Sequence, residues 1–167
     1  KFIDKYDDKN KTFYDSSGVA DDLASAGYWL AIATGDNTYK GRLESFDDYN
    51  GDWYYSLNWD RVNMALYVLK GIEGKGWGRV EEWLGRLNNN QYRYEARWGS
   101  TRYNCTNQLL ALIYAKHRNN SVYAEKAKAQ MDYILGNKDV NLSIDSLHAR
   151  NYVVGFNENS PQRPHHR

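Results

Sequence analysis

Apolar residues recur at intervals of three and four in several short segments of this chain, and glycine or asparagine follows most of these segments. This spacing places the apolar side chains on one face of an α-helix. A glycine directly after such a segment is typical of a helix end, because glycine adopts the left-handed conformation at little cost. No segment alternates apolar and polar residues convincingly, so the sequence indicates an all-α fold of antiparallel helix hairpins. The helices are expected over residues 20–34, 36–43, 60–70, 77–87, 106–116 and 121–136.

The same periodicity predicts which side of each helix faces the core. Gly35 is expected to end the first helix, and Asp36 and Ser121 are expected to cap the helices that follow them. With 167 residues, 41% of them hydrophobic, the chain can bury one core, so residues 1–167 are expected to form a single unit. The residues expected on the inward faces are Leu23, Ala26, Leu30, Ala33, Leu109, Leu110, Ile113, Ala127, Met131 and Ile134.

The charge and the aromatic content of the chain limit the classes of function that it can have. The chain has 22 basic and 21 acidic residues and a formal net charge of +1, so it offers no field that would attract nucleic acid or an anionic membrane. The 15 tyrosines and 6 tryptophans, beside only 4 phenylalanines, provide flat apolar faces with polar rims. Such faces stack well on sugar rings. The single cysteine, Cys105, excludes an internal disulfide.

The stretch at residues 152–167, YVVGFNENSPQRPHHR, has the character of a binding segment. It opens with a strand-like apolar run, and Pro161 and Pro164 then exclude a helix. His165 and Arg167 supply planar, directional donors suited to hydroxyl or carboxylate groups. The alternative interpretation is a frayed, histidine-rich end without a role.

This stretch resembles the histidine signature of the family 9 glycoside hydrolases, in which a V-V-G-F-G run leads through N-x-P-x-x-P to H-H-R. Four other stretches resemble the family in the same order: DDLASAGYWLAIATGDNTY at 21–39, LNWDRVNMALYVL at 57–69, RWGSTRYNCTNQLLALIYAK at 97–116 and YILGN at 133–137. The resemblance implies cellulase chemistry, the hydrolysis of β-1,4-glucan with inversion. It also implies an α/α toroid, a barrel of six helix hairpins, of which this chain would form about the C-terminal half.

The resemblance also indicates what the chain lacks. In the family the catalytic base is an aspartate of a D-A-G-D motif upstream, and the catalytic acid is a glutamate beyond H-H-R; this sequence contains neither segment. Inverting glycosidases need two carboxyl groups about 6.5–9.5 Å apart with a water between them. We therefore expect residues 1–167 to be an incomplete portion of a catalytic domain, inactive alone, that supplies substrate-binding subsites.

Where the motifs match, the resemblance assigns the substrate-cleft roles of the family to residues of this chain. His165 is also expected to support the catalytic groups. The alternative is that Trp98 packs in the core while Arg102 forms a surface ion pair. The substrate-binding residues that the resemblance implies are Tyr55, Trp98, Arg102, Tyr103, His165 and Arg167.

A calcium site is a further expectation from the resemblance. In some relatives a matching S-G-x-x-D-E segment and the aspartate of a later W-D pair bind calcium, which prefers six to eight oxygen ligands. The alternative is that these carboxylates cap helices without a metal. The ligands would be Ser17, Gly18, Asp21, Asp22 and Asp60.

The resulting hypothesis is part of a secreted endo-β-1,4-glucanase that binds β-1,4-glucan or cello-oligosaccharides and uses no organic cofactor. The remaining segments of the same enzyme, or a second copy of the chain, would cover the apolar faces that half a toroid leaves open. The alternative is a non-catalytic glucan-binding or structural fragment. A helical glycosidase with another sugar specificity is a third hypothesis, disfavoured by the combined R-W-G-S and P-H-H-R motifs.

Overall fold

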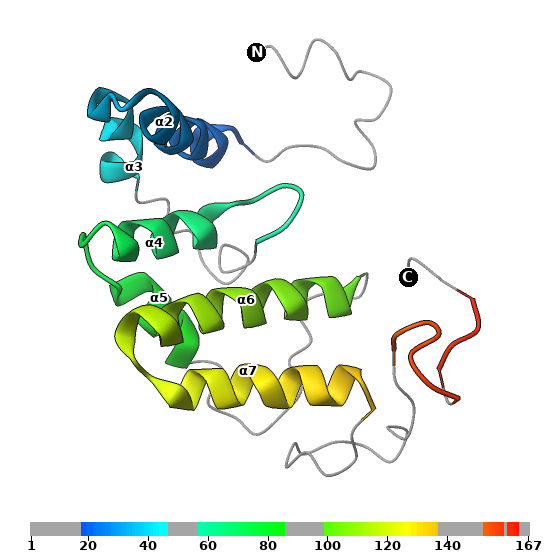
Figure 1. The fold of residues 1–167 in the computed structure, drawn as a ribbon. Coiled ribbons are helices and arrows are strands. Elements are labelled where there is room, and N and C mark those ends of the chain that lie inside the picture. The colour runs from blue at the N-terminus through cyan, green and yellow to red at the C-terminus, as the bar shows by residue number, and fades with distance from the viewer. Residues whose placement is uncertain (1–17, 47–56, 86–98, 137–151, 159, 164–167) are drawn as a thin grey trace, which may run out of the picture.

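The computed structural model describes residues 18–46, 57–85, 99–136, 152–158 and 160–163. Within these ranges the regular secondary structure is helical, with no strand (Figure 1). The predicted all-α class is confirmed. The elements are α2 (Ala20–Thr34), the 3₁₀-helix η1 (Asn37–Lys40), α3 (Gly41–Ser45), α4 (Asn63–Ile72), α5 (Gly78–Gly85), α6 (Ser100–Arg118) and α7 (Ser121–Ile134).

Several helix limits differ from the predictions for local reasons. The helix expected over 36–43 divides into η1 and α3, and Asp36 caps η1 by accepting the N–H of Thr38 at 2.9 Å. The N-cap of α7 is Asn120 rather than Ser121, because the Asn120 side chain accepts the N–H of Val122 at 3.2 Å. Gly35 ends α2 in the left-handed conformation, as predicted, with φ 74°.

Helices α2, α4 and α6 run in the same direction, so that their N-terminal ends lie on one side of the molecule, while α7 returns antiparallel to α6 (Figure 1). Hydrogen bonds join these ends. The Asp21 carboxylate accepts the N–H of Val62 at 2.8 Å, which ties α2 to α4. The Thr106 hydroxyl donates to the carbonyl of Leu57 at 3.2 Å, which ties α6 to the residues before α4. These hydrogen bonds therefore connect the N-terminal parts of α2, α4 and α6 on one side of the molecule.

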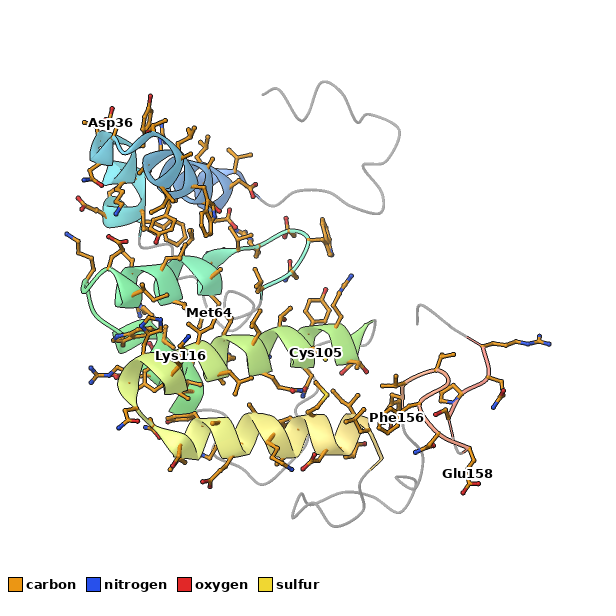
Figure 2. All side chains as sticks on the ribbon, in the orientation of Figure 1. Asp36, Met64, Cys105, Lys116, Phe156 and Glu158 are labelled. Atoms are coloured by element: carbon orange, nitrogen blue, oxygen red, sulfur yellow. The ribbon has the colours of Figure 1, made fainter. Side chains whose placement is uncertain are left out.

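The hydrophobic core lies among α4, α5 and α6. Trp83, Met64 and Leu66 are fully buried there, and Met64 lies in the layer between α4 and α6 (Figure 2). The rings of Trp77 and Tyr114 meet edge to face at 5.3 Å and extend the core toward the end of α6. No helix in the described ranges is long and apolar enough to cross a membrane.

The predicted inward faces were wrong for several residues. Leu23, Leu30 and Leu109 are 44%, 47% and 52% exposed, and Met131 is 36% exposed. Helix α2 instead buries the side that carries Ala24, Tyr28 and Ala31. The physical reason is that α2 and α6 are apolar on two sides, and periodicity alone does not tell which stripe a neighbour covers. Helices that are apolar all round are typical of the interior of larger proteins.

A polar link connects α2, η1 and the end of α4. Glu73 accepts a hydrogen bond from Tyr28 at 3.3 Å and pairs with Lys40 at 2.8 Å. The Lys40 ammonium also lies 5.6 Å from the centre of the Tyr28 ring. The hydrogen bond from Lys40, above all, holds the pKa of Glu73 below its usual value of 4.5. The link is therefore stronger when Glu73 is ionised.

Glu73→Gln should reduce the dependence of stability on acid pH. A carboxyl group with a lowered pKa in the folded state stabilises the fold above its unfolded pKa, and this contribution is lost as the pH falls through the folded value. We expect the difference in melting temperature between wild type and Glu73→Gln to shrink as the pH falls from about 5 to about 3. Glu44→Gln is the matched control, because the Glu44–Lys75 pair is more than half exposed. A difference for Glu73→Gln that stays constant with pH would contradict the assignment.

Candidate functional site

The start of α6 holds two of the predicted substrate-binding residues. Gly99 is the N-cap of α6 in the left-handed conformation, with φ 63°. Its carbonyl accepts the N–H groups of Arg102 at 2.9 Å and Tyr103 at 3.3 Å. Helix α6 therefore begins well before residue 106, its predicted start, and Arg102 and Tyr103 lie in its first turn. We call residues 99–103 the α6 entrance.

Arg102 and Tyr103 form a single cationic and aromatic unit. The Arg102 guanidinium donates to the Tyr103 hydroxyl at 3.1 Å, and its carbon lies 4.8 Å from the centre of the Tyr103 ring. Arg102 is exposed, whereas Tyr103 is partly buried. The Thr106 hydroxyl shares its one hydrogen between the carbonyls of Tyr103 at 2.9 Å and Leu57 at 3.2 Å. Thr106 was not predicted to have this role; its spacing of three from Tyr103 is the signal that could have shown it.

The other predicted binding residues are Tyr55, Trp98, His165 and Arg167. They lie outside the described residues, so their roles stay predictions.

The segment 152–158 adopts bends and turns, so the strand-like reading of its apolar run was wrong. Tyr152 joins it to the end of α7, because its N–H donates to Ile134 at 2.9 Å and its ring lies 5.9 Å from that of Tyr133. Asn157 and Ser160 close a turn through a 2.6 Å hydrogen bond from the Asn157 N–H to the Ser160 hydroxyl. The segment lies on the same side of the molecule as the α6 entrance (Figure 1).

The predicted calcium ligands that the structure describes gather at the starts of α2 and α4. Asp21 is fully buried. One carboxylate oxygen accepts the N–H of Val62, and the other has no hydrogen-bond partner among the described residues. Partial desolvation and the like charges of Asp21 and Asp60 raise the pKa of Asp22, and Arg61 opposes this rise. The carboxylates are therefore close enough to repel one another. We call Gly18, Asp21, Asp22, Asp60 and Arg61 the α2–α4 cluster.

The fit of a calcium ion to this cluster is partial. The unpartnered oxygen of Asp21 suits a cation. However, the described residues contain no group of three or more His, Cys, Asp or Glu side chains placed to hold a metal ion. Ser17 lies outside the described residues. Sequence reasoning missed Arg61 here, although it directly follows Asp60. Calcium binding stays a prediction.

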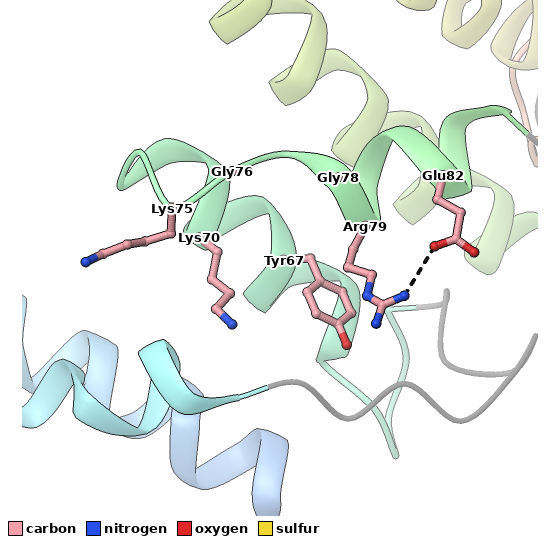
Figure 3. Close-up of a pocket in the computed structure, with 7 residues that line it drawn as sticks. All are labelled: Tyr67, Lys70, Lys75, Gly76, Gly78, Arg79 and Glu82. Carbon is pink, nitrogen blue, oxygen red and sulfur yellow. Dashed lines mark hydrogen bonds and ion pairs between the residues drawn. The ribbon is translucent and has the colours of Figure 1, made fainter.

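A hollow of about 400 Å³ lies at the opposite end of α4 from the α6 entrance (Figure 3). Its basic side chains are already engaged: Lys70 donates to the Phe46 carbonyl, Lys75 pairs with Glu44 at 3.2 Å, and Arg79 pairs with Glu82 at 3.3 Å. Among the described residues that line this hollow, Tyr67 is the only aromatic one. Its lining residues are Tyr67, Lys70, Lys75, Gly76, Gly78, Arg79 and Glu82.

Comparison with known proteins identifies the family. The model of glycosyl hydrolase family 9 matches residues 1–167. The chain belongs to this family. Endoglucanase A of Bacillus pumilus is 30% identical over 183 residues, an alignment that covers 93% of this chain and 26% of that protein. Endoglucanase 15 of Arabidopsis thaliana is 29% identical over 197 residues, covering 93% of this chain and 37% of that protein.

Solved structures of family 9 catalytic domains share the fold. The cellulase Cel9M of C. cellulolyticum in complex with cellobiose superposes with a TM-score of 0.68 at 25% identity, covering 89% of this chain and 36% of that one. The catalytic domain of Clostridium thermocellum CelT gives a TM-score of 0.62 at 28% identity, covering 94% of this chain and 37% of that one. The predicted fold class, a portion of the family 9 α/α toroid, is confirmed. The chain spans between a quarter and two fifths of the length of these relatives.

Proposed function

We propose that this chain is part of the catalytic domain of a secreted endo-β-1,4-glucanase and that its α6 entrance binds β-1,4-glucan. The observation that carries the proposal is the pairing of Arg102 with Tyr103 at the exposed start of α6. Membership of glycosyl hydrolase family 9 supports the reaction class, and relatives named endoglucanases support the substrate class.

The chemistry of the pair suits a sugar. A tyrosine ring offers an apolar face to the C–H groups of a glucose unit. The Arg102 guanidinium has donors beyond the one that it gives to Tyr103, and these can reach sugar hydroxyls. Because the hydrogen bond and the ring contact fix the guanidinium, little side-chain freedom remains to be lost when a glucan binds.

Hydrolysis requires groups beyond these residues. The family's inverting mechanism uses two carboxyl groups, and no D-A-G-D motif occurs in the 167 residues. The apolar stripe of α2 that carries Val19, Leu23 and Leu30 is exposed within the described part of the chain. We propose that the remaining segments of a family 9 domain cover this stripe and supply the carboxylates.

Arg102→Ala should weaken the binding of cello-oligosaccharides by about tenfold or more, the cost of losing charged hydrogen bonds to sugar hydroxyls. Isothermal titration calorimetry on the 167-residue chain measures this loss. Arg79→Ala is the matched control, because Arg79 lies at the opposite end of α4 and should leave binding unchanged. Equal affinities for wild type and Arg102→Ala would show that the α6 entrance does not take part in glucan binding.

Reducing-sugar release from soluble β-1,4-glucan tests the second half of the proposal. We expect no release above background from the chain alone. Release after addition of the family 9 segments that carry D-A-G-D and the glutamate would support an enzyme part. Release by the chain alone would contradict our placement of the catalytic carboxylates. Glucan binding that never leads to release, even with those segments, would favour the alternative of a non-catalytic glucan-binding fragment.

A further inference from the structure

The turn before α4 has a fixed backbone that presents Asp60 and Arg61 to the start of α2. The Asn58 side chain accepts the N–H groups of Asp60 at 2.8 Å and Arg61 at 2.9 Å. The Asn58 N–H in turn donates to the Arg61 carbonyl at 2.8 Å. The next residue, Val62, donates its N–H to Asp21 at 2.8 Å. The positions of Asp60 and Arg61 relative to α2 are therefore set by backbone contacts.

Three carboxylates bring negative charge to this contact between α2 and the turn before α4. Asp21 is fully buried, and within the described part of the chain one of its carboxylate oxygens has no hydrogen-bond partner. Asp22 follows in the same helical turn, and Asp60 adds a third carboxylate. The positive end of the α2 dipole offsets part of this charge. A buried carboxylate without a further cation would still be costly.

Arg61 lies within this negative charge. Its Nε is 3.7 Å from a carboxylate oxygen of Asp60, and the two side chains are only 14% and 20% exposed. A guanidinium nitrogen of Arg61 lies 3.8 Å from the position that a Cβ on Gly18 would occupy. Gly18 is one of the residues that the family resemblance assigns to calcium. The Arg61 guanidinium therefore lies beside Asp60 and close to Gly18, two of the predicted calcium ligands.

We propose that Arg61 is the built-in cation of the α2–α4 cluster and replaces a bound calcium ion in joining α2 to α4. A calcium ion requires six to eight oxygens at about 2.3–2.6 Å. The neighbouring Arg61 guanidinium already supplies a positive charge beside Asp60 and repels a second cation. Two consequences follow. The chain needs no calcium for stability, and removing the guanidinium leaves a set of carboxylates that can accept calcium.

Arg61→Gln tests both consequences, because glutamine removes the charge and keeps a polar side chain. Thermal unfolding is followed by circular dichroism on metal-stripped protein, with and without calcium chloride. Calcium should leave the wild-type melting temperature unchanged. Arg61→Gln without calcium should melt about 3–6 °C lower, and calcium but not magnesium should recover most of this loss. Arg79→Gln, which breaks the partly exposed pair with Glu82, is the matched control and should respond to neither ion.

Arg61→Lys keeps the positive charge, so its melting temperature should remain insensitive to calcium. This variant distinguishes the loss of the charge from a general disruption of the turn before α4. A calcium-dependent rise in the wild-type melting temperature would overturn the proposal and support the predicted calcium site. An Arg61→Gln variant that calcium does not stabilise, including one that stays unfolded with calcium, would also overturn it. Because the readout is stability, these outcomes do not depend on glucan binding.

Discussion

Trp83→Ala should lower the free energy of unfolding by about 3–5 kcal/mol, the usual cost of truncating a fully buried tryptophan. Trp83 is completely buried on α5 and belongs to the same core cluster as Met64, Leu84 and Leu110. Its removal opens a cavity between helices that cannot close without moving α5. The buried indole N–H has no hydrogen-bond partner in the ranges that the structure describes, so its loss offsets part of the cost. We therefore expect a value near the lower end of the range.

Trp29→Ala is the matched control on α2, because Trp29 is 56% exposed. It should change the free energy of unfolding by less than about 1 kcal/mol. Urea unfolding followed by circular dichroism measures both variants. Trp83→Phe should lie between wild type and Trp83→Ala, since it keeps a buried ring and removes the unpartnered N–H. If the two alanine variants were equally destabilised, α5 would not be an integral part of the core.

The sequence predicted the core around α5 well because its apolar residues occupy one stripe. Val80 and Leu84 lie within the helix expected over 77–87, and both are fully buried. The prediction failed on α2, where Leu23 and Leu30 were expected inside but Ala24 and Tyr28 are buried instead. When a helix carries two apolar stripes, the sequence alone does not show which of them is buried. In the described structure, the covered stripe is the one that faces η1, α3 and α4.

The candidate site also combines features that the sequence shows with contacts that only the fold shows. The family motif placed Arg102 and Tyr103 among the binding residues, but it did not predict their pairing, because adjacent side chains of a helix do not usually face each other. The contact between Asp21 and Val62 joins residues 41 positions apart, and spacing gives no indication of it. The role inferred for Arg61 depends on that contact. Long-range contacts of this kind require the fold.

Gly27→Ala should destabilise the chain by about 1–3 kcal/mol, even though alanine favours helices more than glycine does. Gly27 lies in the middle of α2, where a Cβ would be 2.6 Å from the backbone carbonyl oxygen of Tyr39. A backbone atom of η1 cannot rotate away as a flexible side chain could, so α2 and η1 would have to separate. Gly41→Ala is the matched control, because a Cβ there meets no atom within 4 Å and φ is −55°. That variant should gain about 0.5–1 kcal/mol. Urea unfolding of the two variants should therefore differ in sign, and equal stabilities would contradict close packing of η1 on α2.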